Sequence, residues 1–164
     1  MTQAAESRAS VFVRDLIAAD LDDVVRIDAL HTGERKKRYW RGVLRGFLGT
    51  DQARTRVGLA ACSEDGSEQN ERVIGYLLGE VRAFEFGSEP CGWVFAVAVD
   101  PASGRERVAS RLLAECCARF SAAGVERIRT MVQRNNIPVL SFFRANGFVA
   151  GRFVQLELGL EEKT

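Results

Sequence analysis

The chain has 164 residues and a formal net charge of +1, with 46% hydrophobic and 27% charged residues. These values are typical of one globular domain and exclude a disordered, collagen-like or coiled-coil chain. The near-zero net charge also argues against nucleic acid or an anionic membrane as the main partner.

The cysteines and the single histidine form no metal or redox motif. Cys62, Cys91, Cys116 and Cys117 give no CxxC pair, and His31 alone cannot complete a Cys/His zinc site. No apolar run approaches the roughly 20 residues that span a bilayer, and residues 1–8 lack the apolar region of a secretory signal. We therefore expect reduced, mostly buried thiols in a cytoplasmic protein that holds no metal.

The hydrophobic pattern of the N-terminal half predicts three strands and two helices after a short tail. Alternating residues indicate a strand at Ser10–Arg14, and apolar residues at helical spacing follow Asp20. A polar stretch that contains Asp65-Gly66 indicates a hairpin connection. The expected elements are a tail over residues 1–9, a strand Ser10–Arg14, a helix from Asp20, a helix Arg35–Leu48, and strands Val57–Cys62 and Arg72–Phe86.

The C-terminal half begins with the most apolar run of the chain, Trp93–Val99, which is typical of a strand buried on both faces. Strand–helix–strand order mixed with hairpins predicts an α/β domain with a mixed sheet. The expected elements after that strand are a loop Ala102–Arg107, a helix Val108–Ala122, a strand Glu126–Val132, a helix from Pro138 that ends at Gly147, and a strand Phe148–Leu160 interrupted at Gly151.

The end of the apolar strand is the first candidate for a binding site. Asp100-Pro101 ends the strand, and a short loop leads directly into the next helix. Ligands of open α/β sheets bind at the carboxyl ends of strands, and the free N–H groups of a helix N-terminus favour an anion such as phosphate. The pattern therefore predicts an anion site at this turn.

The same region contains a recognisable motif. Val99-Asp100-Pro101 is followed by Gly104-Arg-Glu-Arg107-Val-Ala109 and then by Leu112-Leu113 in the helix. This order resembles the acetyl-CoA motif of the GNAT N-acetyltransferase superfamily, which reads V-x-P, then (Q/R)-x-x-G-x-(G/A), then Leu-Leu. Downstream, the stretch from Asn136 through Phe142-Phe143 to Gly147-Phe148 resembles the family's N-x-x-A-x-x-F-Y-x-x-x-G-F.

The resemblance covers nearly the whole chain and implies a fold. It implies one GNAT-like α/β domain over residues 10–164, with a mixed, mostly antiparallel sheet whose central parallel strands splay apart between flanking helices. It also implies that the pantetheine arm of acetyl-CoA lies between Trp93–Val99 and Glu126–Val132. The cofactor-binding residues implied in this way are Val97, Ala98, Val99, Arg105, Glu106, Arg107, Val108, Ala109, Ser110, Asn136 and Phe143.

Two positions depart from the family pattern. Arg107 stands where the family has the central glycine of its turn, and a side chain there weakens binding if φ must be positive. An arginine can also contact phosphate directly, but we expect the steric cost to exceed that gain, so that acetyl-CoA binds weakly and Arg107→Gly tightens binding. Phe143 stands where the family places a tyrosine that protonates the leaving thiolate. Phenylalanine has no proton to give, although a thiol is already a tolerable leaving group.

No residue at the family's usual position can serve as the catalytic base, because Trp93 stands where a glutamate is common. Glu80, near the end of the preceding strand, is our candidate for the base, and Glu85, Glu89 or a chain of water molecules are the alternatives. A glutamate at a strand end is often only solvated or paired, here with Arg82.

The basic segment, residues 35–45, combines six basic side chains with Tyr39 and Trp40. Such a pattern suits a surface for phosphates or stacked bases, and it also suits a solvated helix whose aromatic residues enter the core. The resemblance places this helix beside the acceptor site, which makes an acidic or phosphorylated acceptor conceivable. His31 is expected to be a surface or capping residue.

Two functions follow from these observations. The first is an enzyme that uses acetyl-CoA as co-substrate to acetylate a primary amine of a small molecule or protein, by direct attack in a ternary complex. The second is a weak or inactive binding module of GNAT fold, with an eroded pyrophosphate turn at Gly104–Ala109. The expected partners are acetyl-CoA and an amine acceptor, without membrane or nucleic acid, and with a homodimer as an open option.

Overall fold

The computed structural model describes residues 10–48, 55–83, 87–103 and 105–160, apart from 65–70. The tail expected over residues 1–9 lies outside the described residues. Two compact units make up the chain, Met1–Met131 and Val132–Thr164, and each is described by itself.

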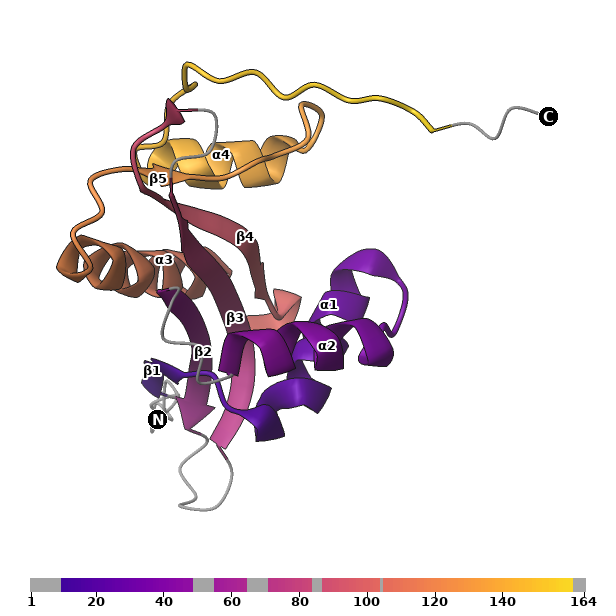
Figure 1. Ribbon diagram of the computed structural model, residues 1–164. Coiled ribbons are helices and arrows are strands. Elements are labelled where there is room, and N and C mark those ends of the chain that lie inside the picture. The colour runs from indigo at the N-terminus through magenta and orange to yellow at the C-terminus, as the bar shows by residue number, and fades with distance from the viewer. Residues whose placement is uncertain (1–9, 49–54, 65–70, 84–86, 104, 161–164) are drawn as a thin grey trace, which may run out of the picture. The chain divides into compact units, whose positions relative to one another are not determined.

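The first unit is built on a five-stranded mixed sheet in the order β1-β2-β3-β4-β5 (Figure 1). Neighbours from β1 to β4 pair antiparallel, and only β4 and β5 pair parallel. This arrangement confirms the expected α/β fold with a mostly antiparallel sheet. The strands are β1 Ser10–Asp15, β2 Arg56–Glu64, β3 Glu71–Arg82, β4 Cys91–Val99 and β5 Ile128–Arg129.

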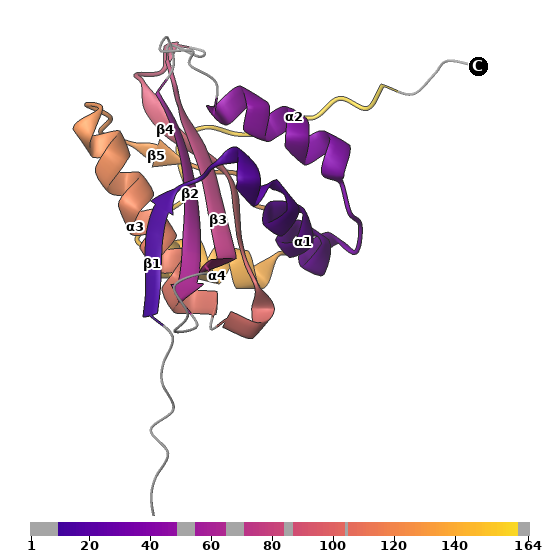
Figure 2. The same ribbon diagram turned by 90° about the horizontal axis from the view of Figure 1, so that it is seen from below.

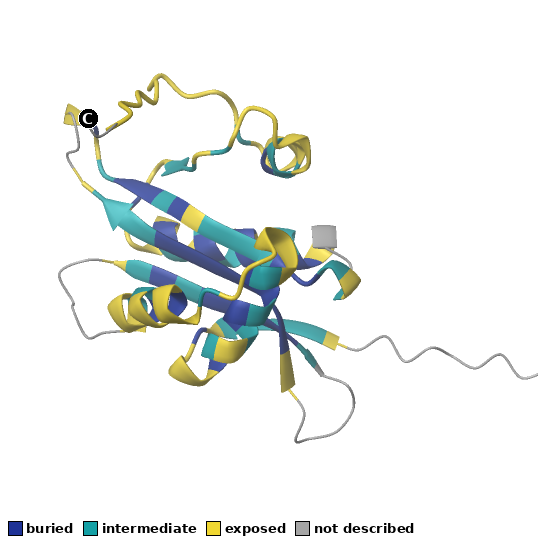
Figure 3. Cartoon of the chain, turned by 90° about the vertical axis from the view of Figure 1, so that its right-hand side faces the viewer, coloured by how far each residue is buried: buried dark blue, intermediate teal, exposed yellow. Residues whose placement is uncertain are grey.

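Helices cover both faces of this sheet (Figure 2). On one face lie α1, Leu21–Thr32, and α2, Lys37–Leu48, which bury Ile27, Trp40 and Leu44 against the sheet. These residues recur at helical spacing, so each helix presents one apolar side to the core. Buried positions therefore concentrate along the sheet and on the inner sides of the helices, as Figure 3 shows.

The other face is covered by α3, Arg105–Ala122, whose Phe120 is fully buried. The ring of Phe120 lies over two glycines of the sheet, Gly79 on β3 and Gly92 on β4. A Cβ at Gly79 would come within 2.9 Å of the Phe120 ring. The absence of a side chain at both positions thus allows α3 to approach the sheet closely.

Three boundaries differ from the sequence-based expectation in the first unit. Residues 101–103 form a 3-10 turn and α3 begins at Arg105, so the expected loop Ala102–Arg107 is half helical. β3 ends at Arg82, and the expected extension to Phe86 runs into residues outside the described part. β5 covers two residues where Glu126–Val132 was expected, because its ladder with β4 stops after one pair beyond Gly92.

The second unit contains α4, Ile137–Ala145, which confirms the helix expected from Pro138 to Gly147. Gly147 has a φ of +87°, a conformation that glycine adopts without strain. The strand expected over Phe148–Leu160 is wrong, since the described residues 148–160 have no regular secondary structure. Alternating residues form a strand only when a neighbouring strand completes the ladder, and residues 132–160 contain none.

A buried carboxylate fixes the turn between β4 and α3. Asp100 is only 5% exposed, and it accepts hydrogen bonds from Arg26 at 2.7 Å and from the N–H of Ala102 at 3.0 Å. Arg26 also donates to the carbonyl of Val73, so it joins α1 to β3 and to this turn. Burial alone would raise the pKa of Asp100, but the Ala102 N–H, Arg26 and Arg72 outweigh it and hold the pKa below its usual value.

We predict that Asp100→Asn lowers the free energy of unfolding by about 2 kcal/mol at pH 7, because it removes the buried charge partner of Arg26, which then keeps only the more exposed Asp23. A carboxylate with a lowered folded pKa stabilises the fold above its unfolded pKa of about 3.9 and loses that contribution as the pH falls further. Urea unfolding of both proteins at pH 7, 5, 4 and 3 measures this difference. A gap that stays constant down to pH 3 would contradict the ionic role of Asp100.

Candidate active site

β4 loses its neighbour on one side halfway along its length. The parallel ladder with β5 ends at Trp93 opposite Arg129, and the hydroxyl of Thr130 donates to the carbonyl of Val94 at 2.8 Å. Beyond that point, no described strand of the first unit pairs with Phe95–Val99 on this side. We call Phe95–Val99 the open edge of β4. The divergence matches the splayed parallel strands that the resemblance implied.

A β-bulge interrupts β4 where the two strands separate. Ala96 lies opposite Leu78 and Val94 lies opposite Gly79, so Phe95 has no partner residue on β3. Phe95 is 37% exposed, and its ring centroid is 5.1 Å from that of Phe47 on α2. A bulge bends the strand and redirects its backbone groups, and bulges are frequent beside active sites.

The backbone groups of the open edge alternate in direction. The N–H of Asp100 donates to the carbonyl of Ile74 on β3 at 2.7 Å. Since successive residues of a strand point their backbone groups to opposite sides, Ala98 belongs to the ladder with β3. Val97 and Val99 direct their N–H and C=O groups to the open edge. An extended chain with amide groups that binds along this edge can therefore form hydrogen bonds with Val97, the central residue of the edge.

His31 forms a hydrogen bond with one of these backbone groups, the carbonyl of Val99. Its Nε2 donates to the carbonyl of Val99 at 2.8 Å, which joins the end of α1 to the end of β4. His31 is exposed, which confirms the expected surface residue, and it also links two elements of the site. This contact was missed from the sequence because 68 residues separate the partners.

The N-terminus of α3 lies one short turn beyond Val99. Its first turn, residues 105–107, is helical, and the first N–H groups of a helix have no partner within it. Val108 was expected to contact the co-substrate. Its side chain is buried, so only its N–H group can make that contact. The helix dipole and these N–H groups favour an anion at the carboxyl end of β4, where the sequence predicts an anion site.

Arg107 is exposed and lies within the helix. From the sequence we expected a side chain at this position to strain the turn, which requires a positive φ at residue 107. Helical backbone has a negative φ, which an arginine adopts freely. The steric part of that expectation therefore does not apply, and the guanidinium extends from the surface of the first turn.

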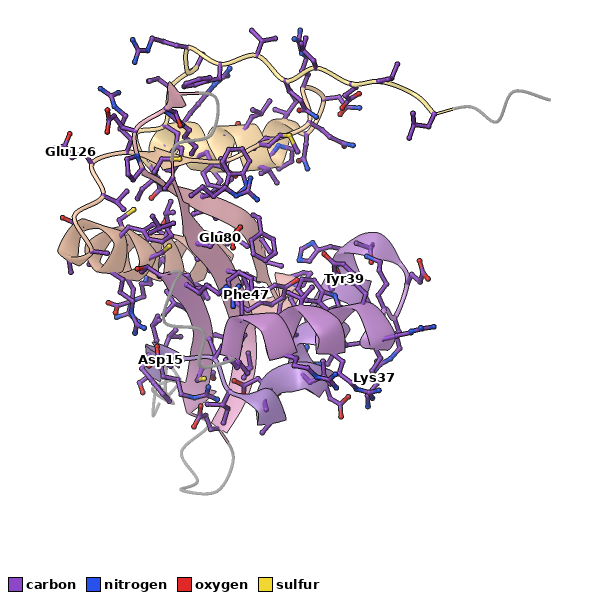
Figure 4. All side chains as sticks on the ribbon, in the orientation of Figure 1. Asp15, Lys37, Tyr39, Phe47, Glu80 and Glu126 are labelled. Carbon is purple, nitrogen blue, oxygen red and sulfur yellow. The ribbon has the colours of Figure 1, made fainter. Side chains whose placement is uncertain are left out.

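Glu80 lies on β3 directly opposite Trp93, close to the point where β4 and β5 separate (Figure 4). Its carboxylate accepts a hydrogen bond from Arg82 Nε at 3.1 Å, and its side chain is 18% exposed. The guanidinium of Arg82 also lies 4.6 Å from the centre of the Trp93 ring. The pairing with Arg82 holds Glu80 in place, while its partial exposure leaves it accessible to a substrate.

Asn136 and Phe143 belong to the second unit. Asn136 is the N-cap of α4, and its side chain accepts a hydrogen bond from the N–H of Val139 at 3.3 Å. The buried ring of Phe143 packs against Phe142 and Phe148, with centroid distances of 5.0 and 4.9 Å. These contacts give both residues a role inside their own unit, and their contact with acetyl-CoA stays a prediction.

The cysteines are poorly suited to covalent catalysis. Burial raises the pKa of Cys62 to about 12 and that of Cys116 to about 12, so neither forms a thiolate near neutral pH. Across the described residues, no group of three His, Cys, Asp or Glu side chains could hold a metal ion. None of the helices that the structure describes has the length and apolar character needed to cross a membrane.

Comparison with protein families gives one match, to the model described as the acetyltransferase (GNAT) family, over residues 25–148. This range contains the open edge of β4, the first turn of α3 and all of α4. No curated protein is detectably similar to the chain in sequence.

Solved structures with the same fold include the aminoglycoside N-acetyltransferase AAC(6')-Iy in complex with CoA, with a TM-score of 0.76 at 14% identity over 96% of this chain and 99% of that one. AAC(6')-Ih from Acinetobacter baumannii matches with a TM-score of 0.71 at 15% identity, over 93% and 100% of the two chains. A protein described as a transcriptional regulator from Bacillus halodurans matches with a TM-score of 0.71 at 17% identity, over 92% and 100%. At these identities the likeness establishes the fold.

We predict that Arg107→Gly is less stable than Arg107→Ala by about 0.5–1 kcal/mol, because glycine loses more backbone freedom when it enters a helix. Arg107→Ala itself is expected to stay within about 0.5 kcal/mol of the parent, since the side chain is exposed. Urea unfolding of the three proteins without ligand measures both differences. A glycine variant more stable than the alanine variant would show that residue 107 needs a positive φ.

Proposed function

The chain belongs to the GNAT acetyltransferase family, and we propose that it transfers the acetyl group of acetyl-CoA to a primary amine by direct attack within a ternary complex. One observation supports this most: the open edge of β4 ends at the first turn of α3. An extended amide chain and a pyrophosphate, joined in one molecule, match these two neighbouring sites in order. The structures of this fold include a CoA complex, which supports the same choice of co-substrate.

In this proposal the main chain holds the co-substrate. The N–H and C=O of Val97 and the N–H of Val99 hydrogen-bond to the amides of the pantetheine arm, because these groups point to the open edge. The N–H groups of residues 105–108, at the start of α3, bind the pyrophosphate. Arg107 adds a charge beside them, and Ala109 and Ser110 follow in the second turn.

The bulge at Phe95 provides the groups that activate the thioester. Backbone N–H groups released from the ladder at the bulge polarise the thioester carbonyl and stabilise the negative charge that develops as the amine attacks. The new C–N bond forms as the C–S bond breaks, and the thiolate of CoA leaves. Phe143 donates no proton, so the thiolate takes one from solvent after it leaves.

The attacking amine must lose a proton, and we assign this step to Glu80. Glu80 lies opposite Trp93, at the start of the open edge. Alternate residues of β3 lie on the same face of the sheet, so Glu80 shares its face with the core residues Tyr76 and Leu78. The Arg82 guanidinium fixes the carboxylate in one orientation, and its second oxygen remains available to accept the proton.

Two alternatives are less well supported. An inactive binding module was suggested by Arg107 and Phe143, and the helical backbone at Arg107 removes the steric part of that argument. An aminoglycoside acceptor is suggested by the names of several similar structures. Aminoglycosides carry several ammonium groups, and the basic segment beside the sheet has six positive charges and no negative one, so it repels such an acceptor.

Val97→Pro is expected to weaken acetyl-CoA binding by about tenfold or more, because it removes the N–H that points to the open edge. That N–H lies outside the β3 ladder, so the sheet tolerates the change. Val97→Ala, which keeps the N–H, is the matched control and should bind within about threefold of the parent. Calorimetric titration measures both. Equal affinity of the proline variant, with its fold intact by circular dichroism, would refute the assignment of the edge.

Glu80→Gln should lower kcat by about a hundredfold while the affinity for acetyl-CoA stays the same, since a general base typically contributes 10²–10⁴-fold. Glu89→Gln, at the alternative position, serves as the comparison and should keep the parent rate. Release of CoA thiol in the presence of a primary amine provides the assay. If Glu89→Gln is the slow variant, the base is at Glu89 and the assignment to Glu80 is wrong.

A further inference from the structure

The basic segment is strongly positive, whereas the rest of the chain is negative overall. Residues 35–45 have six basic and no acidic side chains, whereas the remaining residues carry a net charge of −5, given the total of +1. The strong local field is therefore not a consequence of an overall basic protein. Its position on α2 is a specific feature of the surface.

Part of this charge lines a pocket at the start of α2. The pocket is wide open to solvent, and its wall contains one acidic and four basic side chains. The wall consists of Glu34, Arg35, Lys36, Lys37, Arg38, Tyr39, Gly42 and Val43. The two lysines are paired, Lys36 with Asp28 at 3.0 Å and Lys37 with Asp22 at 2.6 Å. Among the described residues, Arg35 and Arg38 form no salt bridge, although Arg35 contributes after Lys37 to lowering the pKa of Asp22. Two guanidinium groups of the pocket wall thus remain available for a ligand.

The start of α2 retains an excess of positive charge after its two lysines are paired. Its first turn contains no acidic residue and begins with Lys37 and Arg38, although the positive end of a helix dipole favours acidic side chains there. The free N–H groups of the same turn also require acceptors. An anion in the pocket relieves both conditions, since it pairs with the arginines and with the helix N-terminus.

The pocket is joined to the proposed reaction site through α2 itself. Val43 lines the pocket and Phe47, one helical turn further, packs against Phe95 at the bulge. The four residues from Val43 to Phe47 correspond to about 6 Å along the helix, and the eight residues from Tyr39 to Phe47 correspond to about 12 Å. Figure 4 shows Lys37 and Phe47 at opposite ends of α2. A molecule that reaches from the bulge to the pocket therefore spans about 6–12 Å.

We propose that this pocket binds the anionic end of the acceptor, so that the amine substrate is a small molecule with a phosphate or carboxylate about 6–12 Å from its amino group. The inference rests on the proposed function for the amine, and it adds the substrate class. Arg35 and Arg38 bind the anion by charge-assisted hydrogen bonds, and the amine reaches the acetyl group beside Phe95.

The test compares three amines of similar length: 6-aminohexyl phosphate, 8-aminooctanoate and hexylamine. We expect kcat/KM for at least one anionic amine to exceed that for hexylamine by about tenfold or more, the size of one charge-assisted hydrogen bond. The better of the two anionic amines identifies phosphate or carboxylate as the recognised group. Arg35→Ala/Arg38→Ala should reduce this preference by about tenfold. Arg41→Ala/Arg45→Ala is the matched control on the same helix, outside the pocket wall, and should retain the preference.

Binding is followed separately by amide NMR with 6-aminohexyl phosphate and no acetyl-CoA. Shifts at residues 35–43 that disappear in Arg35→Ala/Arg38→Ala support the pocket. Transfer to hexylamine at the same rate as to both anionic amines, without such shifts, overturns the proposal and leaves the proposed function intact. Shifts with no transfer to any amine overturn the proposed function instead. Tighter binding of a ten-nucleotide single-stranded RNA at residues 35–43 would overturn the small-molecule assignment.

Discussion

The structure depends on a difference between the two sides of β4 in how many backbone hydrogen bonds the neighbouring strand supplies. Backbone N–H and C=O groups need hydrogen-bond partners, and β3 supplies them along one side of the strand. On the other side, β5 pairs only with Gly92 and Trp93, and Thr130 ends the contact by donating to Val94. The bulge at Phe95 lies at this point. The open edge beyond it is a row of directed backbone groups held rigid by the rest of the sheet, which suits it to bind an extended amide chain.

The surrounding elements keep that edge in position. Phe120 of α3 packs on two glycines of β3 and β4, which sets the distance of the helix from the sheet. Asp100 and Arg26 then fix the turn by which β4 leads into α3. The N-terminus of α3 is thereby held close to the end of β4, so an anion site and an amide site are adjacent without any metal-ligand cluster among the described residues.

Much of this arrangement could be predicted from local patterns in the sequence. Apolar periodicity located the helices, and the run Trp93–Val99 identified the buried strand. The bulge could not be predicted, because it depends on the register between Leu78 and Gly79 on β3 and the residues opposite them. The alternating residues 148–160 predicted a strand, but pattern alone does not supply the neighbouring strand that a ladder requires. The backbone strain expected at Arg107 was wrong because the start of α3 was placed three residues too late.

The charge on α2 supports our proposal for the acceptor, and the open edge of β4 supports our proposal for the co-substrate. The central claim is that acetyl-CoA binds along the open edge of β4 and the first turn of α3. Amide NMR during an acetyl-CoA titration of the full chain tests it most directly. The account predicts that the largest shifts fall on Val97, Val99 and residues 105–108, with smaller changes on β1 and β2. Saturable binding whose largest shifts lie on β1 and β2, or no binding at millimolar acetyl-CoA, would contradict it.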